Sequence, residues 1–134
     1  MSGERPGPNH RWLIDGMNVI GSRPDGWWRD RDGAVRRLVD RLRGLADAGE
    51  AVTLVLDGRP IEGLPAGRFH GIEIAYARRG GRDAADDRIV ELAAAEPVGW
   101  TVVTSDRNLR GRVEALGCPV VGAKAMLDRL ESGD

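Results

Sequence analysis

The chain alternates between short, largely apolar runs and longer segments in which apolar residues recur every three or four positions. Five runs have the first character: Trp12–Ile14, Ala51–Leu56, Ile72–Ala77, Trp100–Thr104 and Pro119–Val121. Short runs that stay apolar at successive positions are typical of strands buried on both faces of a parallel sheet. We therefore predict five strands over these residues.

The segments between the runs predict four helices, with loops at residues 21–26 and 59–70. The helices begin near Asp32, Asp83, Arg107 and Ala123, and end near Gly49, Pro97, Leu116 and Leu130. Strands that alternate with amphipathic helices indicate an α/β fold. We predict a three-layer α/β/α fold with a central, mainly parallel sheet of about five strands.

The length of 134 residues suits a single domain, which we place at residues 11–131 after a flexible tail at residues 1–10. The tail is polar and lacks the apolar segment of a signal peptide, and no run approaches the roughly 18 apolar residues of a membrane span. The single cysteine, Cys118, excludes an internal disulfide. These features predict a cytoplasmic protein with no membrane partner.

The net charge of -1 gives no overall attraction to nucleic acid. Every basic residue except Lys124 is an arginine. This bias has two explanations: GC-rich coding, or arginines placed to hold phosphate groups with their planar donors. A near-neutral total can still conceal a basic rim around an acidic centre, so the positions of the charges decide.

Acidic residues follow several of the predicted strands. Asp15, Asp57 and Asp106 stand at strand ends, and Asp83, Asp86 and Asp87 open the helix after the third strand. Parallel crossover topology gathers all strand-to-helix loops at one edge of the sheet, where ligands bind in folds of this kind. The sequence therefore predicts a cluster of carboxylates at that edge.

Each aspartate taken singly has a structural explanation, because aspartate is a favoured helix N-cap and is stabilised in a first helical turn. Asp86, however, precedes Ile89 by three residues and Val90 by four, and Asp87 precedes Val90 by three. This spacing predicts that both aspartates continue the inward face of their helix. Clustered carboxylates repel by about 1 kcal/mol per pair even in water, and by more when desolvated. A cation bound among the carboxylates would offset this repulsion, and carboxylate oxygens are ligands that suit Mg²⁺ or Mn²⁺.

Four ordered motifs resemble the signature of the YacP-like NYN domains, which belong to the PIN-like ribonuclease superfamily. They are Asp15-Gly-Met-Asn-Val-Ile20, Leu56-Asp-Gly58, Ala85-Asp-Asp-Arg-Ile89 and Thr104-Ser-Asp-Arg107. The resemblance extends from Arg11 to Leu130 and departs from the family at Met17, where an aromatic residue is usual. We expect that departure to alter packing rather than chemistry.

The resemblance implies roles for particular residues. Asp15, Asp86, Asp87 and Asp106 would hold the catalytic metal, and Asn18 would support the first aspartate and the region of the scissile phosphate. Asp57, which belongs to the YacP-like pattern, and Asp83 are additional candidate acids.

The implied activity is that of a divalent-metal-dependent endoribonuclease, a phosphodiester hydrolase in which a metal-activated water attacks in line. The implied partner is RNA, with ribosome-associated mRNA among the candidates. Two alternatives stay open: a non-catalytic RNA-binding module with the PIN-like fold, and a PIN-type toxin held by a partner. The number of metals, the preference for RNA over DNA and the oligomeric state are left open as well.

Five arginines would surround the acidic edge and could bind phosphates, although solvated surface arginines are an equal alternative for each: Arg78, Arg79, Arg82, Arg107 and Arg110. Trp27 and Trp28 could stack on unpaired bases, with core packing expected for at least one of them. A haloacid-dehalogenase phosphatase is excluded because Met17 stands where the second acid is needed. A response-regulator receiver is disfavoured because the acidic pair after the first strand is missing.

Overall fold

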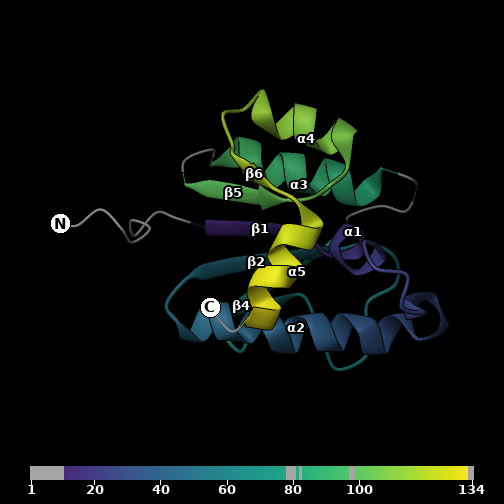
Figure 1. The fold of residues 1–134 in the computed structure, drawn as a ribbon. Coiled ribbons are helices and arrows are strands. Elements are labelled where there is room, and N and C mark those ends of the chain that lie inside the picture. Colours follow the sequence, from purple (N-terminus) through teal and green to yellow (C-terminus); the bar gives the residue numbers. More distant parts are fainter. Residues whose placement is uncertain (1–10, 78–80, 82, 97–98, 133–134) are drawn as a thin grey trace.

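The computed structural model describes residues 11–77, 81, 83–96 and 99–132; the predicted flexible tail at residues 1–10 lies outside them. Its centre is a six-stranded sheet in the order β3-β4-β2-β1-β5-β6 (Figure 1). The strands are β1 (Arg11–Asp15), β2 (Ala51–Leu56), β3 (Gly67–Phe69), β4 (Ile72–Tyr76), β5 (Trp100–Val103) and β6 (Val120–Val121). All neighbours pair in parallel except β3 and β4, so the predicted mainly parallel sheet is confirmed.

Helices cover both faces of the sheet (Figure 1). They are α1 (Gly16–Gly21), α2 (Arg31–Asp47), α3 (Ala84–Ala95), α4 (Arg107–Glu114) and α5 (Ala123–Ser132), with a 3₁₀ turn, η1, at Trp27–Arg29. One hydrophobic core joins α1, α2 and α5 to the sheet, and a second joins α3 and α4 to its other face. The predicted three-layer arrangement is therefore confirmed.

Successive side chains of β1 point to opposite faces of the sheet. Trp12 and Ile14 of β1 belong to the core under α1, α2 and α5, whereas Leu13 belongs to the core under α3 and α4. Side chains alternate along a strand, so Asp15 is expected on the same face as Leu13. The last residue of β1 therefore lies toward α3 and α4.

Two elements differ from the prediction. The segment predicted as a loop at residues 59–70 contains β3, which pairs antiparallel with β4 at the sheet edge, Phe69 opposite Ile72. The same segment is held by the Tyr76 hydroxyl, which accepts from the Ile61 N–H (3.1 Å) and donates to the Leu64 carbonyl (2.7 Å). In addition, β1 passes directly into α1, without a loop between them.

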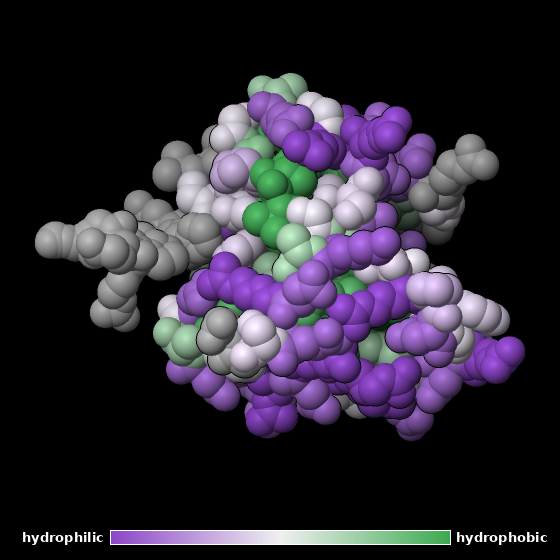
Figure 2. Space-filling model, in the orientation of Figure 1, coloured by the Kyte–Doolittle hydropathy of each residue, from purple (hydrophilic) through white to green (hydrophobic). Residues whose placement is uncertain are grey.

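The surface in Figure 2 is largely hydrophilic, with an apolar strip over the region of β6. Both residues of that short edge strand are half-buried. Among the described residues, no helix has both the length and the apolar character that a membrane crossing requires.

Gly16 makes the direct passage from β1 into α1 possible. A Cβ at this position would lie 2.8 Å from Leu56 Cδ2 and 2.9 Å from the Val55 carbonyl oxygen. Only a residue without a side chain lets α1 start this close to β2. The position of α1, and of the residues it presents at the sheet edge, therefore depends on this glycine.

We expect Gly16→Ala to lower the free energy of unfolding by about 1–3 kcal/mol, because the added methyl group overpacks against backbone that cannot move freely. Gly44→Ala is the matched control: it lies within α2 with nothing within 4 Å of an added Cβ, and should stabilise by about 0.5–1 kcal/mol. Urea denaturation of both variants measures the difference. Equal stability of the two variants would contradict the close contact.

Candidate active site

Asp15 is the most deeply buried acid at the carboxyl edge of the sheet. It ends β1, is 4% exposed, and its Oδ2 accepts a hydrogen bond from the Thr104 hydroxyl at 2.9 Å. The pKa of Asp15 is raised to about 6, chiefly by burial and to a lesser extent by the charges of Asp86 and Asp106; the Thr104 hydrogen bond and the Asn18 backbone amide oppose the rise. The carboxylate is thus held in place, although burial and neighbouring charge disfavour its ionised form.

Thr104 connects the ends of two neighbouring strands. Ile14 pairs with Val103 in the parallel register, so the residues that follow them, Asp15 and Thr104, lie side by side. The Thr104 hydroxyl donates to Asp15 and accepts from the Asp106 N–H at 3.1 Å. The sequence placed Thr104 at a strand end and in the motif with Ser105 and Asp106, but it gave this hydroxyl no role in the site.

Asp106 combines a structural and a site position. Its Oδ1 accepts from the Leu109 N–H at 2.9 Å and so caps α4. Its charge also raises the pKa of both Asp15 and Asp86. The N-cap explanation is therefore correct for one oxygen and does not remove Asp106 from the acidic cluster.

Asn18 links three segments around the site. Its Oδ1 accepts from the Ser105 N–H at 2.8 Å, and the Ser105 Oγ accepts from the Ala123 N–H at 2.8 Å. These bonds join α1, the turn after β5 and the start of α5. The Asn18 side chain thus fixes the turn that presents Asp106, whereas the predicted support was for Asp15 and the region of the scissile phosphate.

Asp86 approaches the cluster from α3 and is half-buried. Its pKa is raised to about 6, chiefly by burial and then by the charges of Asp106 and Asp83, while Arg112 opposes the rise. Asp83 is exposed at the N-cap of α3, where its side chain makes no capping hydrogen bond. The structure therefore brings Asp15, Asp86 and Asp106 together, with Asp83 beside Asp86.

Asp87 does not lie on the inward face, so that prediction was wrong. Its side chain is 61% exposed and pairs with Arg112 of α4 at 3.0 Å. The buried positions of α3 are Ala85, Ile89 and Ala93, whereas Val90, on which the prediction relied, is only half-buried. Arg112, which the sequence reasoning missed, is the cation that reaches this acidic helix.

Asp57 ends β2 but is paired with a cation. Arg31 donates to the Asp57 carbonyl oxygen, and its Nη2 lies 4.0 Å from the carboxylate Oδ1. The carboxylates that raise the pKa of Asp15 are those of Asp86 and Asp106. The structure therefore places Asp57 in an ion pair beside the N-terminus of α2.

The predicted substrate contacts are only partly described. Arg78, Arg79 and Arg82 lie outside the described residues. Arg107 and Arg110 are exposed on α4, and Arg110 pairs with Glu114 at 3.2 Å. Trp27 packs against the core, whereas Trp28 is 56% exposed, with ring centroids 6.1 Å apart in an edge-to-face contact.

The donor set fits a hard divalent cation. Its candidate ligands are all carboxylate oxygens, the type that Mg²⁺ and Mn²⁺ prefer. Within the described ranges no three His, Cys, Asp or Glu side chains are close enough to enclose an ion alone. Mg²⁺ commonly binds through one or two carboxylates and several waters, so this arrangement suits it.

A mainly parallel sheet flanked by helices, with acids gathered at its carboxyl edge, agrees with the PIN-like fold expected from the sequence motifs. The sequence pattern of the YacP-like NYN domain matches residues 12–133, and the chain belongs to that family. The predicted family is thereby confirmed.

Solved structures of one relative share the fold. Rae1 (YacP) from Bacillus subtilis is 24% identical with a TM-score of 0.75, covering 92% of this chain and 74% of that one. Its W164L mutant is 23% identical with a TM-score of 0.73, covering 92% and 76%. No curated protein sequence matches the chain.

The raised pKa values predict an unusual dependence of stability on pH when no metal is present. Asp15 has a pKa of about 6 in the folded protein and an ordinary value of 3.8 when unfolded, so between these values the folded state binds more protons. This contribution is therefore lost as pH rises from about 4 to about 6. Asp15→Asn, which can still accept from Thr104, should gain about 2 kcal/mol over the wild type at neutral pH.

Urea denaturation in EDTA, carried out from acid to neutral pH, measures this difference. The advantage of Asp15→Asn should shrink as the pH falls through about 6 and should vanish only below the ordinary value of 3.8, where the wild-type carboxyl is protonated in both states. A variant that is less stable than the wild type at neutral pH would contradict the strained carboxylate.

Proposed function

We propose that this protein is a divalent-metal-dependent endoribonuclease that hydrolyses RNA phosphodiester bonds at the acidic edge of its sheet. The observation that carries the proposal is the buried Asp15 carboxylate, held by Thr104 while Asp86 and Asp106 repel it. An arrangement of this kind lowers the stability of the folded protein, and a bound cation would offset the repulsion between the carboxylates. Membership of the NYN family supports the same assignment.

The residues divide the work as follows. Asp15, Asp86 and Asp106 would hold Mg²⁺ or Mn²⁺, one or two of them directly and the rest through bound water, because no three described acidic side chains are close enough to enclose an ion alone. Asp87 is a weaker candidate ligand because its carboxylate pairs with Arg112. The bound ion would polarise a phosphoryl oxygen and lower the pKa of a water. Thr104 keeps Asp15 oriented and Asn18 keeps the turn of Asp106 in register. Ribosome-associated mRNA is one candidate among the RNA substrates.

Repulsion also argues against a purely binding role. A protein that only binds RNA gains nothing from carboxylates whose pKa values are raised by one another, because they repel phosphate as well. A toxin held by a partner would have the same chemistry and would differ only in its regulation. Hydrolysis is therefore the activity to test first.

We expect the purified protein to cleave single-stranded RNA with Mn²⁺ or Mg²⁺ and to be inactive in EDTA. Asp15→Asn and Asp106→Asn should each lower the cleavage rate more than about 100-fold. Loss of a residue that only supports a metal ligand typically costs up to about 100-fold, and loss of a ligand itself should cost more. Asp40→Asn, on the exposed side of α2, is the control and should retain wild-type activity. The readout is cleavage of an end-labelled RNA, followed on a denaturing gel.

Two results would contradict the proposal. Undiminished cleavage by both Asp15→Asn and Asp106→Asn would show that these aspartates do not form the active site. A folded wild type that binds RNA and cleaves none would favour the binding module.

Thr104 offers a graded test of positioning. Thr104→Val removes the hydroxyl that donates to Asp15 and accepts from Asp106, so we expect a loss of about 10- to 100-fold in kcat and weaker activation by metal. Thr104→Ser keeps the hydroxyl and should restore most of the activity. Metal titration of cleavage rates separates the two effects, and equal activity of the Val and Ser variants would contradict the role.

A further inference from the structure

An open groove lies between α1 and the start of α5, beside the candidate active site. It has a volume of about 580 Å³, and its lining includes Met17, Asn18, Ser22, Ser105, Lys124 and Ala125. Asn18 and Ser105 also belong to the hydrogen-bond network that presents Asp106. The groove therefore adjoins the turn that carries Asp106.

The charge of the groove is opposite to that of the edge it adjoins. No carboxylate is among its lining residues, and Lys124, the one lysine of the chain, is its charged member. The first turn of α5 thus presents a cation, whereas the acids of this helix, Asp128 and Glu131, pair with Arg23 further along. A polyanion bound at the acidic edge and extending into this groove would therefore meet the Lys124 ammonium and no carboxylate of the lining.

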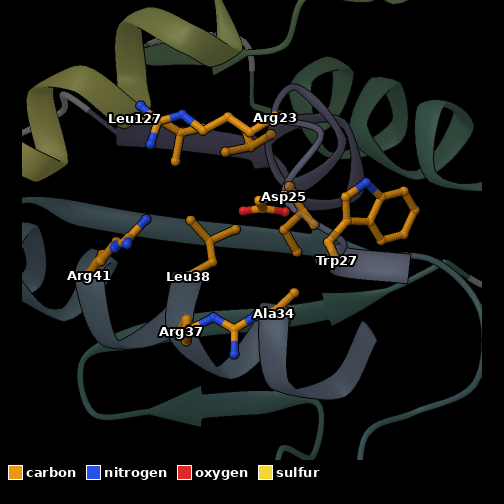
Figure 3. Close-up of a pocket in the computed structure, with 10 residues that line it drawn as sticks. Arg23, Asp25, Trp27, Ala34, Arg37, Leu38, Arg41 and Leu127 are labelled. Atoms are coloured by element: carbon orange, nitrogen blue, oxygen red, sulfur yellow. The ribbon is translucent and has the colours of Figure 1, made fainter. Parts of the chain in front are cut away.

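A second hollow, between α1, α2 and α5, is a poorer candidate although it is lined by three arginines, Arg23, Arg37 and Arg41 (Figure 3). Its volume is only about 60 Å³, and Asp25 also lines it. Arg23 pairs with Asp128 and Glu131, and Arg41 lies 3.6 Å from Glu131. Arg23 and Arg41 thus connect α5 to the segments beside it, and their charge is matched by its acids.

We propose that the groove between α1 and α5 holds a nucleotide of single-stranded RNA next to the scissile phosphate, with the Lys124 ammonium on a phosphate of that strand. The inference rests on the proposed function and names the path of its substrate. A volume of about 580 Å³ is within the range of ligand pockets.

The lining suits each part of a nucleotide. Met17 and Ala125 offer apolar surface to a base or ribose, and the hydroxyl of Ser105 and the amide nitrogen of Asn18 are donors for ribose or phosphate oxygens. A concave groove that takes an unpaired nucleotide favours single strands, because duplex RNA is recognised across its shallow minor groove.

Two variants test the groove, and one distant variant serves as the control. Lys124→Ala removes the cation, and Ala125→Trp fills the groove from an exposed helical position. Arg37→Ala removes a cation from the second hollow and should leave RNA affinity and cleavage unchanged. Thermal melting shows whether each variant is folded, and Lys124→Arg should restore much of the affinity.

Binding and cleavage are measured separately. Fluorescence anisotropy of a labelled single-stranded RNA, with the Asp106→Asn background to prevent cleavage, gives Kd at several salt concentrations. Lys124→Ala should weaken binding about 10-fold and reduce the slope of log K against log salt by about 0.7, the value for one phosphate contact on a single strand. In the active background, Lys124→Ala and Ala125→Trp should raise KM with little change in kcat.

The outcomes distinguish the two proposals. If the wild type cleaves RNA while Lys124→Ala and Ala125→Trp leave Kd, salt slope and KM unchanged, the groove is overturned and the ribonuclease stands. If the wild type cleaves no RNA but its binding depends on Lys124, the ribonuclease proposal is overturned, and the groove remains an RNA-binding site with no scissile phosphate beside it. If both variants bind and cleave as Arg37→Ala does, the groove assignment is wrong.

Discussion

A carboxylate buried at the end of an inner strand is the constraint on which the rest of this structure depends. β1 lies between β2 and β5, so Asp15 emerges where neighbouring strands enclose it on both sides. Its charge is tolerated because Thr104, one position beyond the end of β5, donates to it in register. Gly16 completes the arrangement, since only its missing side chain lets the chain turn into α1 against β2.

The same arrangement makes stability and chemistry compete. Asp15 and Asp86 have raised pKa values for reasons of burial and mutual repulsion, so the protein without metal carries charge that its fold disfavours at neutral pH. Asp106 shows how the conflict is limited: one oxygen is occupied in capping α4, which fixes the carboxylate while its charge still acts on the cluster. Structural and functional explanations of such a residue are therefore compatible.

Much of the fold could be predicted from the sequence because apolar runs alternating with amphipathic segments determine a parallel sheet covered on both faces. The three residues of β3 carry no such pattern, since Gly67-Arg68-Phe69 owes its strand to pairing with β4. Of the candidate site, Asp15, Asp86 and Asp106 followed from topology. Asp87 was misplaced because Val90 was taken as inward, and the roles of Thr104 and Arg112 depend on tertiary contacts that spacing does not reveal.

The cations around α5 fall into two groups with different consequences. Arg23 and Arg41 face Glu131, so their charge is used to hold α5 beside α1 and α2. This attachment positions the start of α5, whose Ala123 N–H completes the chain of bonds through Ser105 to Asn18. Lys124 follows directly and lines a groove without carboxylates. The paired arginines thus fix the position of α5, and Lys124 at its start faces the groove in which we propose that a substrate strand lies.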